Sequence, residues 1–273
     1  MTDARPPIVM VFAGHDPSGG AGIQADIETL ASLGCHACTI TTALTAQDSQ
    51  SVKDFMPVPA TFLVEQARAV LEDMPVAAFK IGMTGSVETI EAIHTLLQDY
   101  QKLPVVFDPV MAGGGGGSLA KENLVEAFQD LLIPQASIIT PNTLEAKRLC
   151  SDSDTLDACA QQLMAHGAEY VFITGGHEKS ADIVNRLWGH RKFLAEYKQT
   201  RLNNEYHGTG CTLASAIAGF VAHGASMETA VRDAQSYTAK AVAHGRRLGM
   251  GQLIPDRLSW SSKHTAKHYR SEP

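Results

Sequence analysis

The chain has 273 residues, of which 44% are hydrophobic and 19% are charged, and its formal net charge at pH 7 is −7. This composition is typical of a soluble globular protein, and the dispersed, negative charge argues against nucleic acid or an anionic membrane as the partner. Because the N-terminus lacks the apolar core of a signal peptide and no apolar run is long enough to span a bilayer, we expect a cytoplasmic protein with a small-molecule ligand.

The first predicted unit is a strand followed by a glycine-rich turn and a helix. Residues 8–14 are an apolar run typical of a strand, and residues 15–22 contain three glycines. Apolar residues then recur at helical spacing from Ile23, and Gly34 ends the run. These glycines do not have the G-x-G-x-x-G spacing of a dinucleotide fingerprint, and the chain contains no G-x-x-x-x-G-K-[ST] motif. Rossmann and P-loop sites therefore lose their main support.

The chain contains five cysteines, Cys35, Cys38, Cys150, Cys159 and Cys211. An odd set with a single C-x-x-C suggests neither a disulfide framework nor a four-ligand zinc site. Cys35 and Cys38 could form a redox or metal pair, but they lead into a β-branched run at 39–42, so we predict buried strand thiols. Four histidines without metal-site spacing are predicted on helix surfaces or at helix ends: His94, His166, His223 and His244.

Strands and helices then alternate along the chain. Strands are predicted at residues 76–81, 105–107, 137–139 and 171–173. Helices are predicted from Ser86, from Lys121 to Leu132 and from about Asn142. This alternation predicts an α/β fold with a mainly parallel sheet and helices on both faces. Ligands bind at the carboxyl ends of such strands, where the glycine-rich and polar segments of this chain fall, so several turns should converge on one crevice.

The segment His207 to Thr212, which reads His-Gly-Thr-Gly-Cys-Thr, precedes a predicted helix that ends at Gly224. The first amides of a helix lack internal partners, and the glycines let an anion approach them closely, so we predict a site for phosphate or a transferring phosphoryl group. Cys211 lies in the first turn, where the same field favours a thiolate and hence a proton acceptor. The alternative is a glycine-punctuated loop that leads to a buried cysteine.

No linker divides the chain, so we predict one domain over residues 1–273 with a core at about 8–248. The polar stretch 256–273 is predicted to be a surface tail that carries no chemistry.

Seven motifs in this order resemble the ribokinase-like superfamily, and most closely the hydroxymethylpyrimidine/phosphomethylpyrimidine kinases of thiamine biosynthesis. The resemblance covers about Ile8 to Leu248. The motifs lie at 13–26, 42–47, 80–83, 108–111, 140–142 with Glu145, 175–177 and 207–212. The first block and Ala46-Gln47 are specific to the pyrimidine kinases, whereas the asparagine–glutamate pair and the anion turn are shared across the superfamily. The resemblance implies a ribokinase-like three-layer α/β/α fold.

The activity that the resemblance implies is transfer of phosphate from Mg-ATP to 4-amino-5-hydroxymethyl-2-methylpyrimidine and then to its monophosphate, which gives the diphosphate in the same site. Cys211 matches the family's base position, and the amides of Gly208, Thr209 and Gly210, with that of Cys211, would form the anion hole. We also expect a homodimer.

The resemblance implies that Gln47 recognises the pyrimidine, because its side-chain amide can pair with a ring nitrogen and the exocyclic amine. Asp26 would bind a substrate hydroxyl or, alternatively, cap its own helix. The residues expected to line the ring are Gly14, Ala21, Thr45 and Met83.

On the nucleotide side, Asp108 and Glu145 are the expected metal-side carboxylates, acting on Mg²⁺ through water, although each could be a solvated strand-end acid. Asn142 faces the nucleotide phosphates in the family, or is simply a helix N-cap. Thr174 and Gly176 are also expected beside the nucleotide.

Two departures from the family pattern stand out. Thr174 replaces a lysine that reaches the phosphates in many relatives, so charge neutralisation would depend on Mg²⁺ and the anion turn. Residues 113–117 are five glycines where relatives have a mixed lid, which predicts a mobile cover or, alternatively, a spacer.

Competing functions remain open on the sequence alone. A pyridoxal or pyridoxine kinase would share the fold and the base, and Gln47 with the first block argues against it. A non-catalytic pyrimidine-binding regulatory protein is favoured only by Thr174, and a nicotinamide-dependent oxidoreductase has the least support.

Overall fold

The computed structural model describes residues 5–111, 118–176 and 181–260, with the backbone alone described for 118–122. The described residues form a nine-stranded sheet in the order β3-β2-β1-β4-β5-β6-β7-β8-β9. Its strands are β1 (Ile8–His15), β2 (His36–Gln47), β3 (Val52–Pro57), β4 (Val76–Ile81), β5 (Val105–Phe107), β6 (Ile138–Ile139), β7 (Tyr170–Ile173), β8 (Asp182–Gly189) and β9 (Lys192–Thr200). The six strands from β2 to β7 in this order are parallel, and β3, β8 and β9 are antiparallel additions at the two edges.

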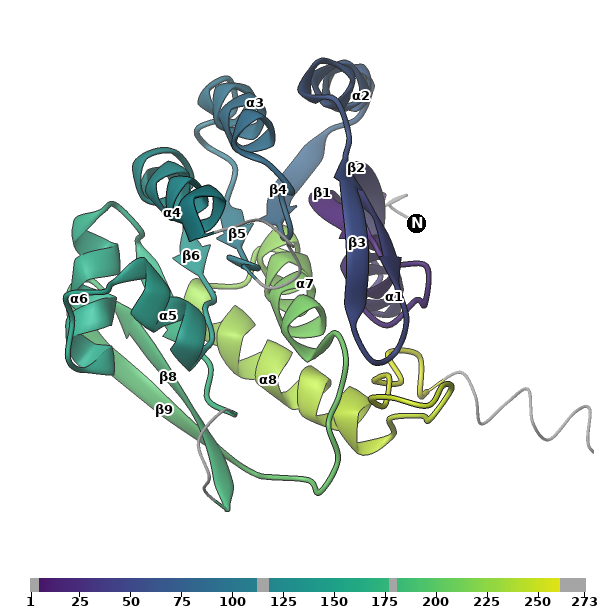
Figure 1. Cartoon of the computed structure of the whole chain (residues 1–273), viewed down its shortest axis with the longest axis vertical. Helices are drawn as coiled ribbons and strands as arrows, with labels where there is room; N and C mark the ends of the chain where they lie inside the picture. The colour runs from purple at the N-terminus through teal and green to yellow at the C-terminus, as the bar shows by residue number, and fades with distance from the viewer. Residues whose placement is uncertain (1–4, 112–117, 177–180, 261–273) are drawn as a thin grey trace, which may run out of the picture.

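Helices cover both faces of the sheet (Figure 1). Their bounds are α1 (Gly22–Ser32), α2 (Ala60–Asp73), α3 (Val87–Gln98), α4 (Ser118–Ala127), α5 (Thr143–Leu149), α6 (Leu156–Ala165), α7 (Thr209–Ala222) and α8 (Met227–Ala243). Apolar residues of α1, α7 and α8 pack on one face, and those of α2 to α6 pack on the other. The predicted three-layer α/β/α fold is thus confirmed.

Strand β1 shows why the sheet needs both layers. Met10 and Phe12 belong to the cluster under α2 to α6, whereas Val9, Val11 and Ala13 belong to the cluster under α1, α7 and α8. Successive side chains of a strand point to opposite faces, so an apolar run without alternation buries both faces. The continuous apolar character of residues 8–13 is the local signal for this central position.

The order of the strand connections changes direction beside β1. The chain runs from β1 to β2 on one side and later returns to β4 on the other, which makes the carboxyl ends of β1 and β4 a topological switch point. In open α/β sheets ligands bind at such points. The turn after β1 and the segment Gly82-Met83 after β4 therefore flank the expected site.

Several sequence predictions are confirmed at single residues. Ser86 caps α3, and Asn142 caps α5. His166, His223 and His244 are the C-cap residues of α6, α7 and α8, while His94 lies within α3 and contacts the carbonyl of Leu131. Cys35 and Cys38 are both buried, as predicted, but only Cys38 lies within a strand, because β2 begins at His36.

Other features were not predicted. The helix expected to reach Leu132 becomes a π-helical turn at Phe128–Leu132 and a 3-10 turn at Ile133–Gln135. The antiparallel strands at both edges also went unrecognised. The five glycines at 113–117 lie outside the described residues, so their predicted role as a cover remains a prediction. Among the described residues, no helix has the length and apolar character needed to cross a membrane.

Candidate active site

Two glycine-rich segments meet at the carboxyl end of β1. The first, which we call the β1 loop, spans residues 16–22 and leads into α1; the second, the anion turn, spans residues 207–211 and leads into α7. Gly208 is the N-cap of α7, with a φ of 81°, and no side chain caps this helix end. A Cβ on Gly208 would overlap the carbonyl oxygen of Gly20, so only glycine lets the two segments approach this closely.

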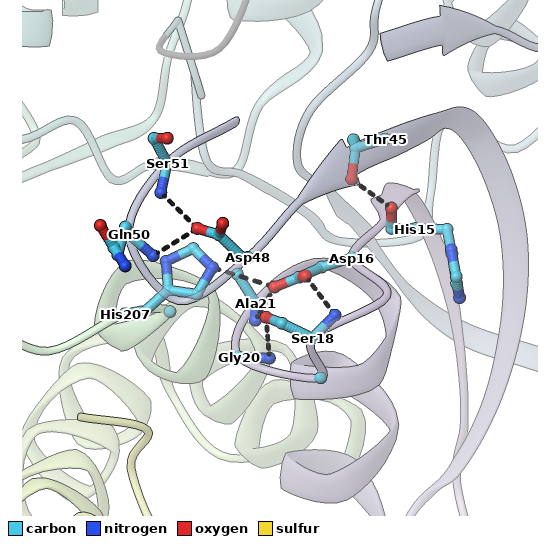
Figure 2. Close-up of polar contacts among 12 residues, drawn as sticks. His15, Asp16, Ser18, Gly20, Ala21, Thr45, Asp48, Gln50, Ser51 and His207 are labelled. Carbon is cyan, nitrogen blue, oxygen red and sulfur yellow. Dashed lines mark hydrogen bonds and ion pairs between the residues drawn. The ribbon is translucent and has the colours of Figure 1, made fainter. Parts of the chain in front are cut away.

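Asp16 organises the β1 loop and joins it to the anion turn (Figure 2). Its carboxylate accepts hydrogen bonds from the amides of Ser18 and Ala21, at 2.8 Å each, and its Oδ2 lies 2.9 Å from Nε2 of His207. These hydrogen bonds favour the charged form and outweigh burial, which alone would raise the pKa, so the pKa of Asp16 falls to about 2. Neither Asp16 nor His207 was singled out from the sequence, although both lie in the quoted motifs.

Cys211 is partly exposed in the first turn of α7, and the backbone N–H of Gly22, at the start of α1, acts to lower the pKa of its thiol. The thiol therefore faces the N-termini of both α7 and α1. Burial raises its pKa to about 11, and the negative charges of Asp108 and Asp26 add to this effect against the opposing charge of Lys80. The expectation that the helix field makes Cys211 a thiolate is wrong for the ligand-free protein, because desolvation and two nearby acids outweigh that field.

A buried ion pair lies beneath the site. Nζ of Lys80 lies 3.0 Å from Oδ1 and 3.1 Å from Oδ2 of Asp26, and both side chains are 0% exposed. The hydroxyl of Ser215 donates to the same carboxylate at 2.6 Å. Nearby negative charges raise the pKa of Lys80 despite burial, so the ammonium stays charged.

The two roles expected for Asp26 need correction. Ala21, not Asp26, is the N-cap of α1, and no side chain caps that helix. Contact with a substrate hydroxyl is not supported either, because the carboxylate is inaccessible and both of its oxygens already have partners in Lys80 and Ser215. Lys80 was quoted only within the motif 80–83 and was given no role, although a lone lysine in the apolar run Val76–Ile81 was a usable signal.

Asp108 and Glu145 form an acid pair, and neither carboxylate takes part in an ion pair among the described residues, although the charges of Lys80 and Arg148 act on them. Asp108 is buried, and its Oδ2 has no hydrogen-bond partner among those residues. Burial raises the pKa of Asp108 to about 6 even though Lys80 lowers it, and burial together with the charge of Asp108 raises that of Glu145 to about 7. The Oδ2 atom lies 3.9 Å from the Cβ position of Gly210, so the unpartnered oxygen faces the anion turn.

Asn142 and Glu145 also have a structural role. The side chain of Asn142 accepts from the amides of Leu144 and Glu145, and Oε2 of Glu145 accepts from the amide of Asn142 at 2.9 Å. This is a capping box, which confirms the N-cap alternative for Asn142. Glu145 is therefore fixed in place by its own helix, and the predicted phosphate contact of Asn142 stays a prediction.

The residues expected around the pyrimidine come from the carboxyl ends of β1, β2 and β4. The Cβ position of Gly14 lies 3.1 Å from the sulfur of Met83, which brings these two positions together, and Ala21 is held at the start of α1 by Asp16. The hydroxyl of Thr45 donates to the carbonyl of His15, so it orients the backbone rather than facing a ligand freely. Gln47 is half-buried at the end of β2.

Thr174 follows β7 and lies beside the capping box, since its amide donates to the carbonyl of Pro141 and its carbonyl accepts from the amide of Thr143. Beside it, a guanidinium nitrogen of Arg201 donates to the carbonyl of Gly176 at 2.8 Å. A cation thus reaches the turn after β7 from the residue that follows β9, although residue 174 itself is uncharged.

The C-terminal segment is not the inert surface tail that we expected. Arg257 is 2% exposed and donates to the carbonyls of Gly19 and Gly20 in the β1 loop. It also contacts Thr212 in α7 and forms an ion pair with Glu28 in α1. Its burial is a tertiary property that a polar stretch does not reveal; residues 261–273 lie outside the described part.

Comparisons with known proteins agree with this geometry. A family model described as phosphomethylpyrimidine kinase matches residues 16–256. The chain is 39% identical over 247 residues, 89% of its length, to a thiamine biosynthesis bifunctional protein of Geobacter sulfurreducens, but it spans only about 50% of that protein. It is 38% identical over 252 residues to a hydroxymethylpyrimidine/phosphomethylpyrimidine kinase of Streptomyces coelicolor. This alignment covers 90% of this chain and 92% of that kinase.

Two solved structures extend the comparison. An ADP complex of Bacillus subtilis pyridoxal kinase superposes with a TM-score of 0.86 at 28% identity, covering 94% of this chain and 99% of that one. A phosphomethylpyrimidine kinase of Clostridium difficile superposes with a TM-score of 0.73 at 34% identity, covering 87% and 99% of the two chains. The backbone is thus more similar to the first protein, and the sequence to the second.

Proposed function

Because the chain belongs to the phosphomethylpyrimidine kinase family, we propose that it transfers the γ-phosphoryl group of ATP to the hydroxyl of 4-amino-5-hydroxymethyl-2-methylpyrimidine and then to the resulting monophosphate. The observation that carries this proposal is the uncapped N-terminus of α7, which lies against the β1 loop with Cys211 in its first turn. Phosphoryl transfer needs alignment, charge stabilisation and a proton acceptor, and this site offers groups for each.

The amides of Thr209, Gly210 and Cys211 would stabilise the negative charge of the transferring phosphoryl group. They are the first amides of α7, they have no side-chain cap, and Gly210 is exposed. Donors fixed before the reaction need no reorganisation as charge develops, which is why such groups contribute strongly to catalysis.

Cys211 would accept the proton of the attacking hydroxyl. With a pKa of about 11 it is protonated at neutral pH in the ligand-free protein, and Asp108 and Asp26 contribute to that shift. A base works best when its pKa lies near the working pH. Compensation of the charge of Asp108 in the ternary complex would bring the thiol closer to that range, while Lys80 already acts in this direction.

The acid pair fits Mg²⁺. An unpartnered buried carboxylate oxygen on Asp108, and two acids whose pKa values are raised by burial and by the charge of a neighbouring carboxylate, leave negative charge that a hard cation would compensate. When bound there, Mg²⁺ would supply positive charge to the nucleotide phosphates. Asp108 and Glu145 would hold it through water, and the capping box keeps Glu145 in place.

On the substrate side, Gln47 would pair with the aminopyrimidine edge, with Gly14, Ala21 and Met83 close to the ring. The contact of Gly14 with Met83 and the placement of Ala21 by Asp16 support a shared site. Thr174 and Gly176 would lie beside the nucleotide, with Arg201 as a nearby cation. The predictions of a homodimer, of a cytoplasmic location and of a single domain over residues 1–273 stay predictions.

A substrate panel tests the proposal. We expect ATP-dependent phosphorylation of the free pyrimidine and of its monophosphate, and Gln47→Leu should weaken pyrimidine binding by about 1–3 kcal/mol while ATP binding stays nearly unchanged. The matched control is Gln101→Leu, since Gln101 is an exposed glutamine before the amino end of the central strand β5, away from the carboxyl ends that flank the site. Titration calorimetry with each ligand measures both effects.

Other results of the same panel would contradict the proposal. Turnover of pyridoxal in preference to the pyrimidine would favour the pyridoxal kinase alternative, for which the high TM-score to the Bacillus subtilis enzyme is the one specific observation. Absence of ATP turnover with every substrate would favour a non-catalytic pyrimidine-binding protein. Equal pyrimidine affinity in Gln47→Leu and wild type would assign recognition of the pyrimidine to another residue.

A further inference from the structure

The guanidinium of Arg257 connects three elements that enclose the proposed site. Its Nε donates to the hydroxyl of Thr212 at 2.9 Å, and its Nη1 lies 3.1 Å from Oε2 of Glu28. The remaining contacts are to the β1 loop, where Nη1 donates to the carbonyl of Gly19 at 3.4 Å and Nη2 donates to that of Gly20. Arg257 lies one residue beyond the family match, in the segment shown in yellow beside α1 in Figure 1.

Two hydrogen bonds hold the backbone at Asp256 and Arg257 against α8. The carbonyl of Arg257 accepts a hydrogen bond from the hydroxyl of Tyr237 in α8 at 2.8 Å, and the amide of the preceding Asp256 donates to the carbonyl of Ala241. From this fixed backbone the side chain of Arg257 extends into the junction between the β1 loop and α7. Its guanidinium can therefore hold the β1 loop at a fixed place relative to α8.

We infer that Arg257 is a positioning residue, which holds the β1 loop against the anion turn and so maintains the close approach of the Gly20 carbonyl to Gly208, three residues before Cys211. It acts through the carbonyls of the loop and the Thr212 hydroxyl, one residue after Cys211. The consequence for the reaction rate rests on the proposed function, whereas the geometric consequence for Cys211 does not.

Arginine is required at this position for a geometric reason. A guanidinium presents five N–H donors in a planar fork, and here that fork meets acceptors on the β1 loop, α1 and α7 at once. A lysine ammonium is a single point of charge that could retain the ion pair with Glu28 but not the whole set. Loss of the fork leaves a buried loop carbonyl and a buried hydroxyl without a donor, which favours local opening of the junction.

Chemical modification of Cys211 tests the geometry without any substrate. The other four cysteines are buried, so a neutral maleimide should react first with Cys211, as peptide mapping would verify. We expect Arg257→Lys and Arg257→Ala to raise the labelling rate of Cys211 about tenfold or more, and guanidinium ion to restore slow labelling in Arg257→Ala only. Arg246→Ala is the matched control, since it removes an exposed ion pair with Asp256 in the same segment.

The outcomes separate the inference from the proposed function. Unchanged labelling in a folded Arg257→Lys variant, or faster labelling that the Arg246→Ala control reproduces, would overturn the inference. If Arg257→Ala does not fold, Arg257→Lys carries the same test. In steady-state kinetics we expect kcat to fall about tenfold in Arg257→Lys, with recovery of kcat by guanidinium in Arg257→Ala. A wild-type protein without kinase activity but with the labelling pattern intact would refute the function and leave the positioning role.

Discussion

The site contains two sets of buried charges that differ in how they are balanced. Lys80 and Asp26 compensate one another at 3.0 Å, and Ser215 completes the set. Asp108 and Glu145 repel one another, and the Oδ2 of Asp108 has no hydrogen-bond partner among the described residues. A buried charge must be paired or its pKa shifts toward the neutral form, and the two sets illustrate each outcome.

This difference indicates a structural role for one set and a role in ligand binding for the other. Lys80 and Asp26, the complete pair, compensate each other's charge, so we assign them to stabilising the sheet and α7 beneath the site. Asp108 and Glu145, the incomplete pair, lack such compensation, and Asp108 faces the anion turn at Gly210. A nucleotide and its cation would lie there under the proposed function. Lys80 links the two sets, because its charge lowers the pKa of both Asp108 and Cys211.

Removing the cation from the complete pair should have the largest effect. We expect Lys80→Met to lower the free energy of unfolding by about 3–5 kcal/mol, because the charge of Asp26 is left buried without its partner. Lys53→Met, which breaks an exposed ion pair with Asp48, should cost less than about 1 kcal/mol. Urea denaturation of both variants measures the difference, and equal, small losses would mean that Lys80 is not needed for stability.

The thiol next to Lys80 is the second test. We expect Cys211→Ala to bind both substrates normally but to lower kcat on the order of a hundredfold, the usual effect of losing a general base. Cys38→Ala, a buried thiol in β2, controls for loss of a cysteine elsewhere. Wild-type turnover in Cys211→Ala would make the thiol structural.

The incomplete pair, Asp108 and Glu145, should make the free energy of unfolding depend on pH and on Mg²⁺. An acid with a raised pKa binds its proton more tightly in the folded state, so the free energy of unfolding should fall as pH rises from about 4 to about 7, the interval between the ordinary and shifted pKa values. Mg²⁺ at pH 8 should recover stability in wild type. Asp108→Asn should gain roughly 1–2 kcal/mol in the absence of metal and should respond less to Mg²⁺.

Thermal denaturation across pH, with and without Mg²⁺, measures these effects. Stability that rises between pH 4 and 7 in wild type, or a response to Mg²⁺ that Asp108→Asn retains in full, would show that the acid pair is not the cation site.

A cation introduced beside the acid pair should have the smallest effect. Thr174 lies next to the capping box, and the second phosphoryl transfer brings two anions together. We therefore expect Thr174→Lys to accelerate phosphorylation of the monophosphate a few-fold more than that of the free alcohol. Single-turnover rates for both steps give the ratio. An unchanged ratio, or a selective loss of the second step, would show that other groups, with Arg201 as the first candidate, already meet this requirement.

Much of the fold could be predicted because its signals are local. The run at 8–13 is apolar on both faces, Ser86 and Asn142 are side-chain caps, and Gly34 takes a positive φ after α1. The hairpin of β8 and β9 was missed because its turn places His190 and Arg191 at positive φ, without the glycine or asparagine typical of such turns.

The candidate site divides in the same way. Its glycine-rich segments and Cys211 could be named from residue types and their spacing, and the resemblance to the family added Asp108 and Glu145 as expected metal-side acids. The roles of Lys80, His207 and Arg257 could not, since each depends on a partner at least 54 residues away in the chain.

The sequence by itself determined the α/β architecture and the placing of glycine-rich segments at the carboxyl ends of strands, because these follow from side-chain pattern and helix-end chemistry over short stretches. Only the tertiary structure decided that Asp26 is paired with Lys80, that the Cys211 thiol is protonated and that Arg257 joins the β1 loop to α7 by hydrogen bonds. Burial and long-range pairing set these properties, since desolvation and the charges brought close by folding determine both the pKa of a group and the partners left to it.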